Sequence, residues 1–150
     1  MYNQLINYLN RPFPVLETSR EKLGISAYFG FFIFIFLLIF QPFGISDTPD
    51  TVLWVTLGYG VITFLVVAAI VFGAGIIMPG FFNPDEWAVK HHLLLSVANL
   101  VVISAANWAY AKYFAIDGEH HYSLLSFLFI TLVVGIFPDL FSIYYYENKF

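Results

Sequence analysis

The chain has 150 residues, of which 60% are hydrophobic and only 11% are charged, and its mean hydropathy is +0.79. A soluble domain carries about 25% charged residues, so this composition excludes an ordinary soluble protein. The net charge of −4 gives no electrostatic basis for binding nucleic acid, and the absence of cysteine excludes disulfides and thiolate metal sites. The few charges lie between long apolar runs, which is the distribution of an integral membrane protein.

The first residues of the chain predict a short amphipathic helix. Its apolar side chains follow the spacing of one helix face, and they are Tyr2, Leu5, Ile6 and Leu9. Two prolines within Arg11–Pro14 end this helix, because proline cannot continue it. We expect residues 1–18 to lie on the inner surface of the membrane, with a frayed chain end as the alternative.

Four apolar runs predict four membrane-spanning helices at about 19–41, 49–78, 84–114 and 121–146. Three of them begin at helix-capping signals. These are Thr18 with Glu21, Thr48 before Pro49 and Asp50, and Asn83 before Pro84, Asp85 and Glu86. The predicted fold is an all-α membrane protein, with residues 19–147 forming an antiparallel bundle of four transmembrane helices.

Cations give the orientation of this bundle. If the N-terminus is cytoplasmic, the cytoplasmic side holds Arg11, Arg20, Lys22, Lys90 and Lys149, and the outer side holds Lys112. This bias satisfies the positive-inside rule, so both termini are expected in the cytoplasm. No small-residue cleavage site follows the first apolar run, which we therefore expect to remain as a span.

Pairs of small residues are candidates for close helix packing. Ser26 and Gly30 are four residues apart in the first span, and Ala69 and Gly73 are four apart in the second. Small side chains at this spacing allow the backbones of two helices to approach. We expect these pairs to support contacts within the bundle or between two copies of the chain.

Polar residues form a candidate intramembrane site in the third and fourth spans. Ser96, Asn99 and Asn107 share one helix face, and Asp139 follows Pro138 in the last span. Amides and carboxyls are costly in hydrocarbon, so this face should point into the bundle. Interhelical hydrogen bonding is one interpretation and a small polar pocket is the other. Gly135 and Pro138 also predict a kink in the last span.

A weaker candidate for metal binding lies in the predicted outer loop. It consists of Asp117, Glu119, His120 and His121, which could hold a divalent cation or form a solvated loop. His91 and His92 lie about 30 Å away, across the membrane, so the two histidine pairs cannot ligate one haem. The sequence has no motif of a catalytic site, so we expect neither enzymatic activity nor a cofactor.

Short motifs follow one another in a defined order along the chain. They are Arg11-Pro12-Phe13-Pro14, Gln41-Pro42-Phe43-Gly44-Ile45-Ser46, Gly58-Tyr59-Gly60, Ile62-Thr63-Phe64, Pro79, Asp85-Glu86-Trp87, Asn107 with Tyr110, and Gly135-Ile136-Phe137-Pro138. This order resembles the membrane-embedded N-terminal region of bacterial LytTR-type transcription regulators over nearly the whole chain. In that family an apolar residue is expected where this chain has Asp139.

The resemblance implies a sensor or anchor in the bacterial cytoplasmic (inner) membrane, acting as a homodimer. In full-length relatives a cytoplasmic DNA-binding LytTR domain follows the fourth helix, so this chain is not expected to bind DNA itself. The alternatives are a small transporter or membrane enzyme using Asn99, Asn107 and Asp139, and a structural subunit of a membrane complex.

Overall fold

The computed structural model describes residues 1–15, 18–41, 50–80, 82–114 and 122–149 of the chain. Its described elements are helices: α1 (Tyr2–Leu9), α2 (Ser19–Phe40), α3 (Val52–Ile77), α4 (Val89–Tyr113) and α5 (Leu124–Lys149). Four of them, α2 to α5, are long and apolar enough to cross a membrane. The predicted all-α fold with four spans is therefore confirmed, and the lipid bilayer is the surrounding medium of these helices.

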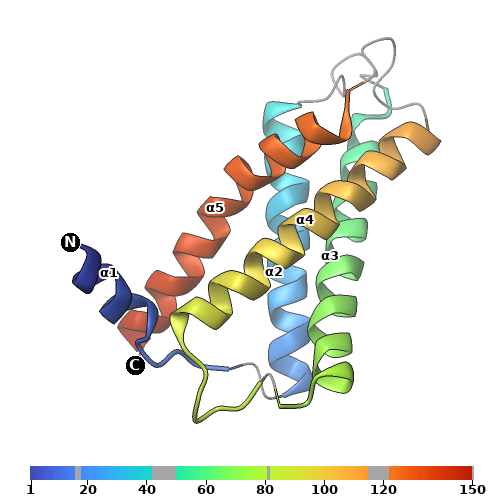
Figure 1. Ribbon diagram of the computed structural model, residues 1–150. Helices are drawn as coiled ribbons and strands as arrows, with labels where there is room; N and C mark the ends of the chain where they lie inside the picture. The colour runs from blue at the N-terminus through green and yellow to red at the C-terminus, as the bar shows by residue number, and fades with distance from the viewer. Residues whose placement is uncertain (16–17, 42–49, 81, 115–121, 150) are drawn as a thin grey trace.

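The spans pack as two helix pairs that cross each other (Figure 1). Contacts are most extensive between α2 and α3, then between α4 and α5, and α3 joins the two pairs by packing on α4. Among the described residues, the backbones of α2 and α5 approach each other closely at very few points, although their side chains share part of the core. Both chain termini lie at one end of the bundle, called here the terminal end, where α5 has diverged from α2 (Figure 1).

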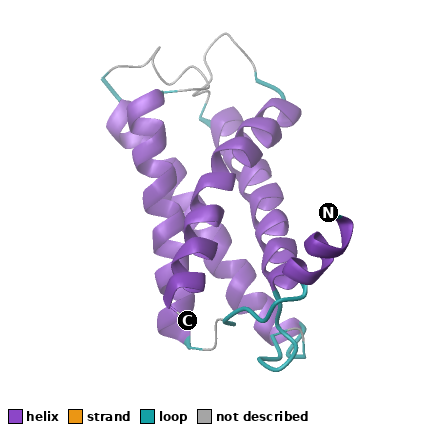
Figure 2. Ribbon diagram, turned by 90° about the vertical axis from the view of Figure 1, so that its left-hand side faces the viewer, coloured by secondary structure: helices purple, strands orange, loops and turns teal. Residues whose placement is uncertain are grey.

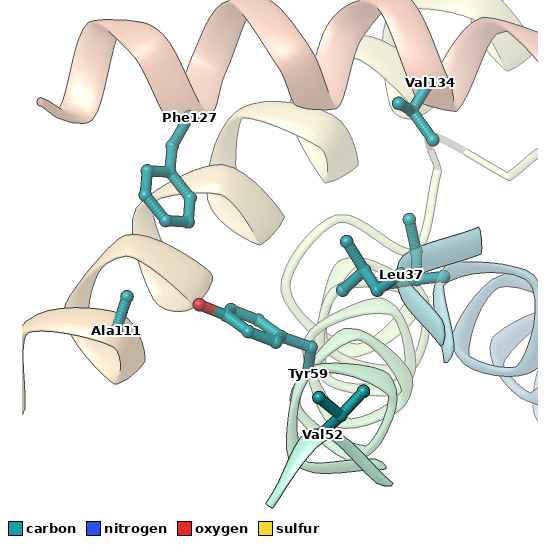
Figure 3. Packing of buried hydrophobic residues seen from close by; sticks show 7 residues of the cluster. Leu37, Val52, Tyr59, Ala111, Phe127 and Val134 are labelled. Carbon is teal, nitrogen blue, oxygen red and sulfur yellow. The ribbon is translucent and has the colours of Figure 1, made fainter. Parts of the chain in front are cut away.

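The core changes its composition along the bundle. At the end away from the termini, side chains from all four spans meet, and Figure 3 shows Tyr59 reaching from α3 toward Ala111 and Phe127. In the middle, Phe29 of α2 packs with residues of α3 and α4. At the terminal end α4 and α5 pack with the N-terminal segment instead of with α2. Residues 10–15 and the described part of the connection between α3 and α4 lie together at the terminal end (Figure 2).

The helix starts agree only in part with the capping signals. The Thr18 hydroxyl accepts a hydrogen bond from the Glu21 amide (3.1 Å), and the Glu21 carboxylate accepts one from the Thr18 amide (3.4 Å). This reciprocal pair is the predicted cap of α2. Thr48 and Pro49 lie outside the described residues, and α3 begins at Val52.

The start of α4 at Val89 corrects the prediction that this helix begins at Pro84. Asn83 forms a turn instead of a helix cap: its side-chain oxygen accepts from the Asp85 amide, and its carbonyl accepts from the Glu86 amide. Asparagine stabilises such turns as readily as helix starts. The His91 imidazole takes over the role of the cap by accepting from the Ala88 amide.

The N-terminal segment is fixed to the start of α4 by a short antiparallel bridge between Pro12 and Ala88. The Phe13 amide donates to the Trp87 carbonyl and the Val89 amide donates to the Arg11 carbonyl, both at 3.1 Å. The Phe13 side chain is buried. We call residues 11–14 the strap, because they cross the terminal end of the bundle.

Replacing Phe13 with leucine should loosen the strap without affecting the spans. The Phe13 ring lies 4.5 Å from the His92 ring, and an aromatic contact of this kind contributes about 1 kcal/mol. Hydrogen exchange of the Phe13 and Val89 amides should therefore rise roughly fivefold, a change of ~1 kcal/mol. Leu5→Ala, at an exposed position of α1, is the control. Unchanged exchange in Phe13→Leu would contradict this role of the ring.

Candidate intramembrane polar site

The four polar residues predicted to face the bundle interior are all buried, with exposed fractions of 6 to 7% for Ser96, Asn99, Asn107 and Asp139. The structure divides them between two places. Ser96 and Asp139 meet toward the terminal end, whereas Asn107 lies about 16 Å farther along α4 at the helical rise per residue. Ser96 and Asn107 therefore lie too far apart along α4 to contact one small group together.

Near the terminal end, Ser96 of α4 donates a buried hydrogen bond to the Asp139 carboxyl of α5. Tyr28 of α2 approaches the same place, because its hydroxyl donates to the Pro138 carbonyl at 3.3 Å. Ser142, one helical turn beyond Pro138, also interacts with Tyr28. Polar groups of α2, α4 and α5 thus meet beside Asp139, and we call Ser96, Asp139, Tyr28 and Ser142 the polar cluster.

The two asparagines are held separately. The Asn99 side-chain amide donates to the Leu95 carbonyl of its own helix (3.1 Å), and that of Asn107 donates to the Thr63 hydroxyl of α3 (3.4 Å). The side-chain oxygens of Asn99 and Asn107 are buried without a hydrogen-bond partner among the described residues. A cavity of about 20 Å³ lies beside Asn107 and Thr131 and is large enough for one water molecule.

The two pairs of small residues predicted to support close helix packing have different surroundings in the structure. Gly30 lies against Gly60: a Cβ on Gly30 would be 2.8 Å from the Gly60 carbonyl oxygen, and a Cβ on Gly60 would be 2.9 Å from that of Gly30. Ser26, one turn before Gly30, is completely buried. A Cβ on Gly73 would meet nothing within 4 Å, and Ala69 is exposed, so contact of this pair with a second copy stays a prediction.

No protein-family model, curated protein or solved structure matches this chain. The assignment of a function therefore depends on the geometry of the helices and of their polar groups.

The remaining histidine and metal predictions have different outcomes. Asp117, Glu119, His120 and His121 lie outside the described residues, so the outer-loop metal site stays a prediction. Among the residues that are described, no group of three or more potential metal ligands lies together. His91 caps α4, and the His92 ring packs on Phe13 with its Nε2 atom buried and without a hydrogen-bond partner there.

Sequence reasoning missed three contributors to these sites: Tyr28, Ser142 and Gly60. Tyr28 lies in a phenylalanine-rich run, in which one hydroxyl gives little signal. Helical periodicity would have placed Tyr28 one turn after Gly24 and Ile25, in the half of α2 that is nearer its polar N-terminal end. Gly60 had a detectable signal, since a glycine inside an apolar span typically marks a close helix contact.

Proposed function

We propose that this chain is a membrane-embedded sensor and anchor module that transmits a change in or across the bilayer to the end of α5. The observation that carries the proposal is the attachment of α5. This helix packs on α4, separates from α2 toward the terminal end, and reaches α2 there through the Tyr28–Pro138 hydrogen bond. The part of α5 near the terminal end can therefore shift at lower cost than its start, where Phe127 and Val134 pack in the core shared with α2.

The polar cluster supports the same proposal. Because the Asp139 carboxyl is buried among spanning helices, its hydrogen bond to Ser96 favours one position of α5 over others. Small displacements of a packed helix, about 2 Å, are a common element of signalling transitions. The ordered resemblance to the membrane region of LytTR-type regulators is consistent with this role, as is a cytoplasmic location of the end of α5.

Under this proposal the chain acts as a homodimer in the bacterial cytoplasmic membrane, and a cytoplasmic effector would receive the motion of α5. DNA binding would belong to that effector. The transporter or membrane-enzyme alternative has less support, because Asn107 lies about 16 Å along α4 from Ser96, the partner of Asp139, and the two asparagines donate to other groups.

The movement of α5 can be measured with pairs of spin labels, because the chain contains no native cysteine. Leu23→Cys in α2 and Leu140→Cys in α5 form the test pair, and Leu23→Cys with Ile76→Cys in α3 forms the control pair; all three positions are exposed. Between nanodiscs of thin and thick bilayers, the α2–α5 distance should change by about 2 Å. The α2–α3 distance should stay constant.

Equal changes in both pairs, or no change in either, would exclude α5 as the moving element. Topology provides a second test. A reporter protein fused after residue 150 must be active on the cytoplasmic side, and an extracytoplasmic reporter would contradict the module proposed here.

A further inference from the structure

The protein covers only one end of the apolar face of α1. Leu9, in the last turn of this helix, packs against the buried residues of the terminal end. Earlier on the same face, 76% of Tyr2, 56% of Leu5 and 37% of Ile6 are exposed. The helix extends from the strap to the side of the bundle (Figures 1 and 2). We call the open part of its apolar face, formed by Tyr2, Leu5 and Ile6, the α1 face.

A contact at the C-terminal end of α1 fixes its depth in the membrane. The Lys90 ammonium donates to the side-chain oxygen of Asn10 at 2.8 Å, and Lys90 is an exposed residue in the first turn of α4. The 25 residues of α4 span about 37 Å, which exceeds the hydrocarbon thickness of about 30 Å. An exposed ammonium at the end of such a helix lies in the head-group region. The end of α1 therefore lies at the level of the head groups.

The membrane surface is the partner that fits the α1 face at this depth. The opposite side of α1 carries the amides of Asn3, Gln4 and Asn7, which can hydrogen-bond to water and head groups. An amphipathic helix at the head-group level buries its apolar face among the upper parts of the acyl chains. The four spans already place lipid around the bundle, so lipid lies next to α1 without a further partner.

The chemistry of α1 favours loosely packed lipid over anionic lipid. Interfacial helices bind through buried apolar area and through attraction of basic side chains to anionic lipids. No charged side chain lies between Tyr2 and Asn10, so only the first contribution acts on α1 itself. Arg11 belongs to the strap and Lys90 to α4, and both stay in place whether α1 is docked or not. Insertion of the α1 face then depends on gaps between the lipids.

We propose that the α1 face docks into the membrane surface at the terminal end, by apolar insertion into loosely packed phospholipid. This goes beyond the expected position of residues 1–18 on the membrane, because it names lipid packing as the property that α1 detects. It names the input of the proposed sensor, and its consequence for α5 rests on the proposed function. Docking itself does not depend on movement of α5.

The strap joins α1 to the ends of α4 and α5. Asn10 is bonded to Lys90, and the strap that follows is bonded to the backbone on both sides of Ala88. The Phe13 side chain belongs to the same buried cluster as Ile143 of α5. A displacement of α1 is therefore passed to these two spans while the strap stays closed.

Spin-label accessibility tests the docking. The full chain, acetylated at its N-terminus to remove the charge of the amine, carries one label at Ile6→Cys on the α1 face or at Asn7→Cys on the opposite side. In nanodiscs of dioleoyl phosphatidylcholine, dissolved oxygen should reach the label at residue 6, and a water-soluble nickel chelate should reach the label at residue 7. Contact of the first label mainly with the chelate would overturn the proposal. So would contact with neither reagent, because another protein surface would then cover the α1 face.

Leu5→Gln and Gln4→Ala form a matched pair in the chain labelled at Ile6→Cys. Both positions are exposed, and leucine, glutamine and alanine all favour helix, so α1 should keep its conformation. The ratio of docked to undocked α1 should fall about tenfold in Leu5→Gln, the factor expected for exposing a leucine side chain. It should stay constant in Gln4→Ala. Equal ratios in the two variants would refute insertion through the α1 face.

Lipid composition separates packing from charge. Palmitoyl-oleoyl phosphatidylcholine packs more tightly than the dioleoyl lipid and should lower the docked fraction of α1. Replacing a third of the dioleoyl phosphatidylcholine with dioleoyl phosphatidylglycerol should leave this fraction unchanged, whereas one basic side chain moving to the surface would raise the docking ratio about fivefold. Such a rise, or equal docking in the two phosphatidylcholines, would overturn the preference for loosely packed lipid.

The spin-label pair in α2 and α5 distinguishes docking from sensing. Docking without any change in the α2–α5 distance would refute the proposed function and leave the docking of α1 intact. A change in this distance that persists in Leu5→Gln, where docking is lost, would refute α1 as the input and leave the proposed function intact.

Discussion

Replacing Gly30 with leucine should destabilise the protein by about 3 kcal/mol, the upper part of the range for overpacking a close contact. The added Cβ would lie 2.8 Å from the Gly60 carbonyl oxygen and 3.0 Å from the Phe64 Cβ, and both belong to the rigid α3 helix. The helices must then separate, because no flexible side chain can move aside. Unfolding in mixed micelles, followed by circular dichroism, measures this loss of free energy.

Gly73→Leu and Gly24→Leu are the controls for this experiment. Each removes a glycine from a spanning helix and adds the same side chain, and neither position has a neighbour within 4 Å of the new Cβ. Both should therefore unfold within about 1 kcal/mol of the native protein, in line with the modest effect of glycine in a helix. If Gly30→Leu is as stable as these two variants, α2 and α3 do not pack through Gly30 and Gly60.

Replacing Ser96 with alanine should cost about 2 kcal/mol, because the Asp139 carboxyl would stay buried after losing its serine partner. Replacing Asp139 with leucine should cost much less, since an apolar side chain in that place needs no hydrogen bond. The double variant should resemble Asp139→Leu alone. The cycle of four unfolding free energies therefore predicts strong non-additivity.

Asp139→Asn is the control for the Ser96–Asp139 pair. Its side-chain oxygen can still accept from the Ser96 hydroxyl, so Asp139→Asn should be more stable than Ser96→Ala while it lacks the acid. Additive effects of Ser96→Ala and Asp139→Leu would show that these residues do not interact in the membrane-embedded protein. The expected coupling would instead identify this pair as the main polar contact between α4 and α5.

The spans were predictable because the bilayer requires about 20 consecutive apolar residues, and this signal is independent of tertiary contacts. The cap formed by Thr18 and Glu21 was predictable for a similar reason, since its two partners lie within one helical turn. The start of α4 was not predictable in this way, because it depends on a contact with a distant segment of the chain. Asn83 and Pro84 fit a helix start, but residues 84–86 form a turn, and the bridge between Pro12 and Ala88 holds Ala88 in an extended conformation.

For the candidate site, the burial of each residue was predictable from the sequence, but the grouping of these residues in space was not. Burial of Ser96, Asn99, Asn107 and Asp139 follows from the cost of polar groups in hydrocarbon, and all four are indeed buried. Their grouping depends on which helices cross at which depth, and a helical wheel of α4 contains no such information. For this reason Ser96 and Asn107 appeared to belong together, whereas Tyr28 of α2 was missed beside Asp139.

The strap imposes an order of events on the synthesis of this protein. The Arg11 carbonyl and the Phe13 amide leave the ribosome early, but their partners at Val89 and Trp87 emerge only after α2 and α3 are complete. The first two spans can associate as a local hairpin through Gly30 and Gly60 in the meantime. Closure of the strap therefore becomes possible when the start of α4 emerges, before α5 is made.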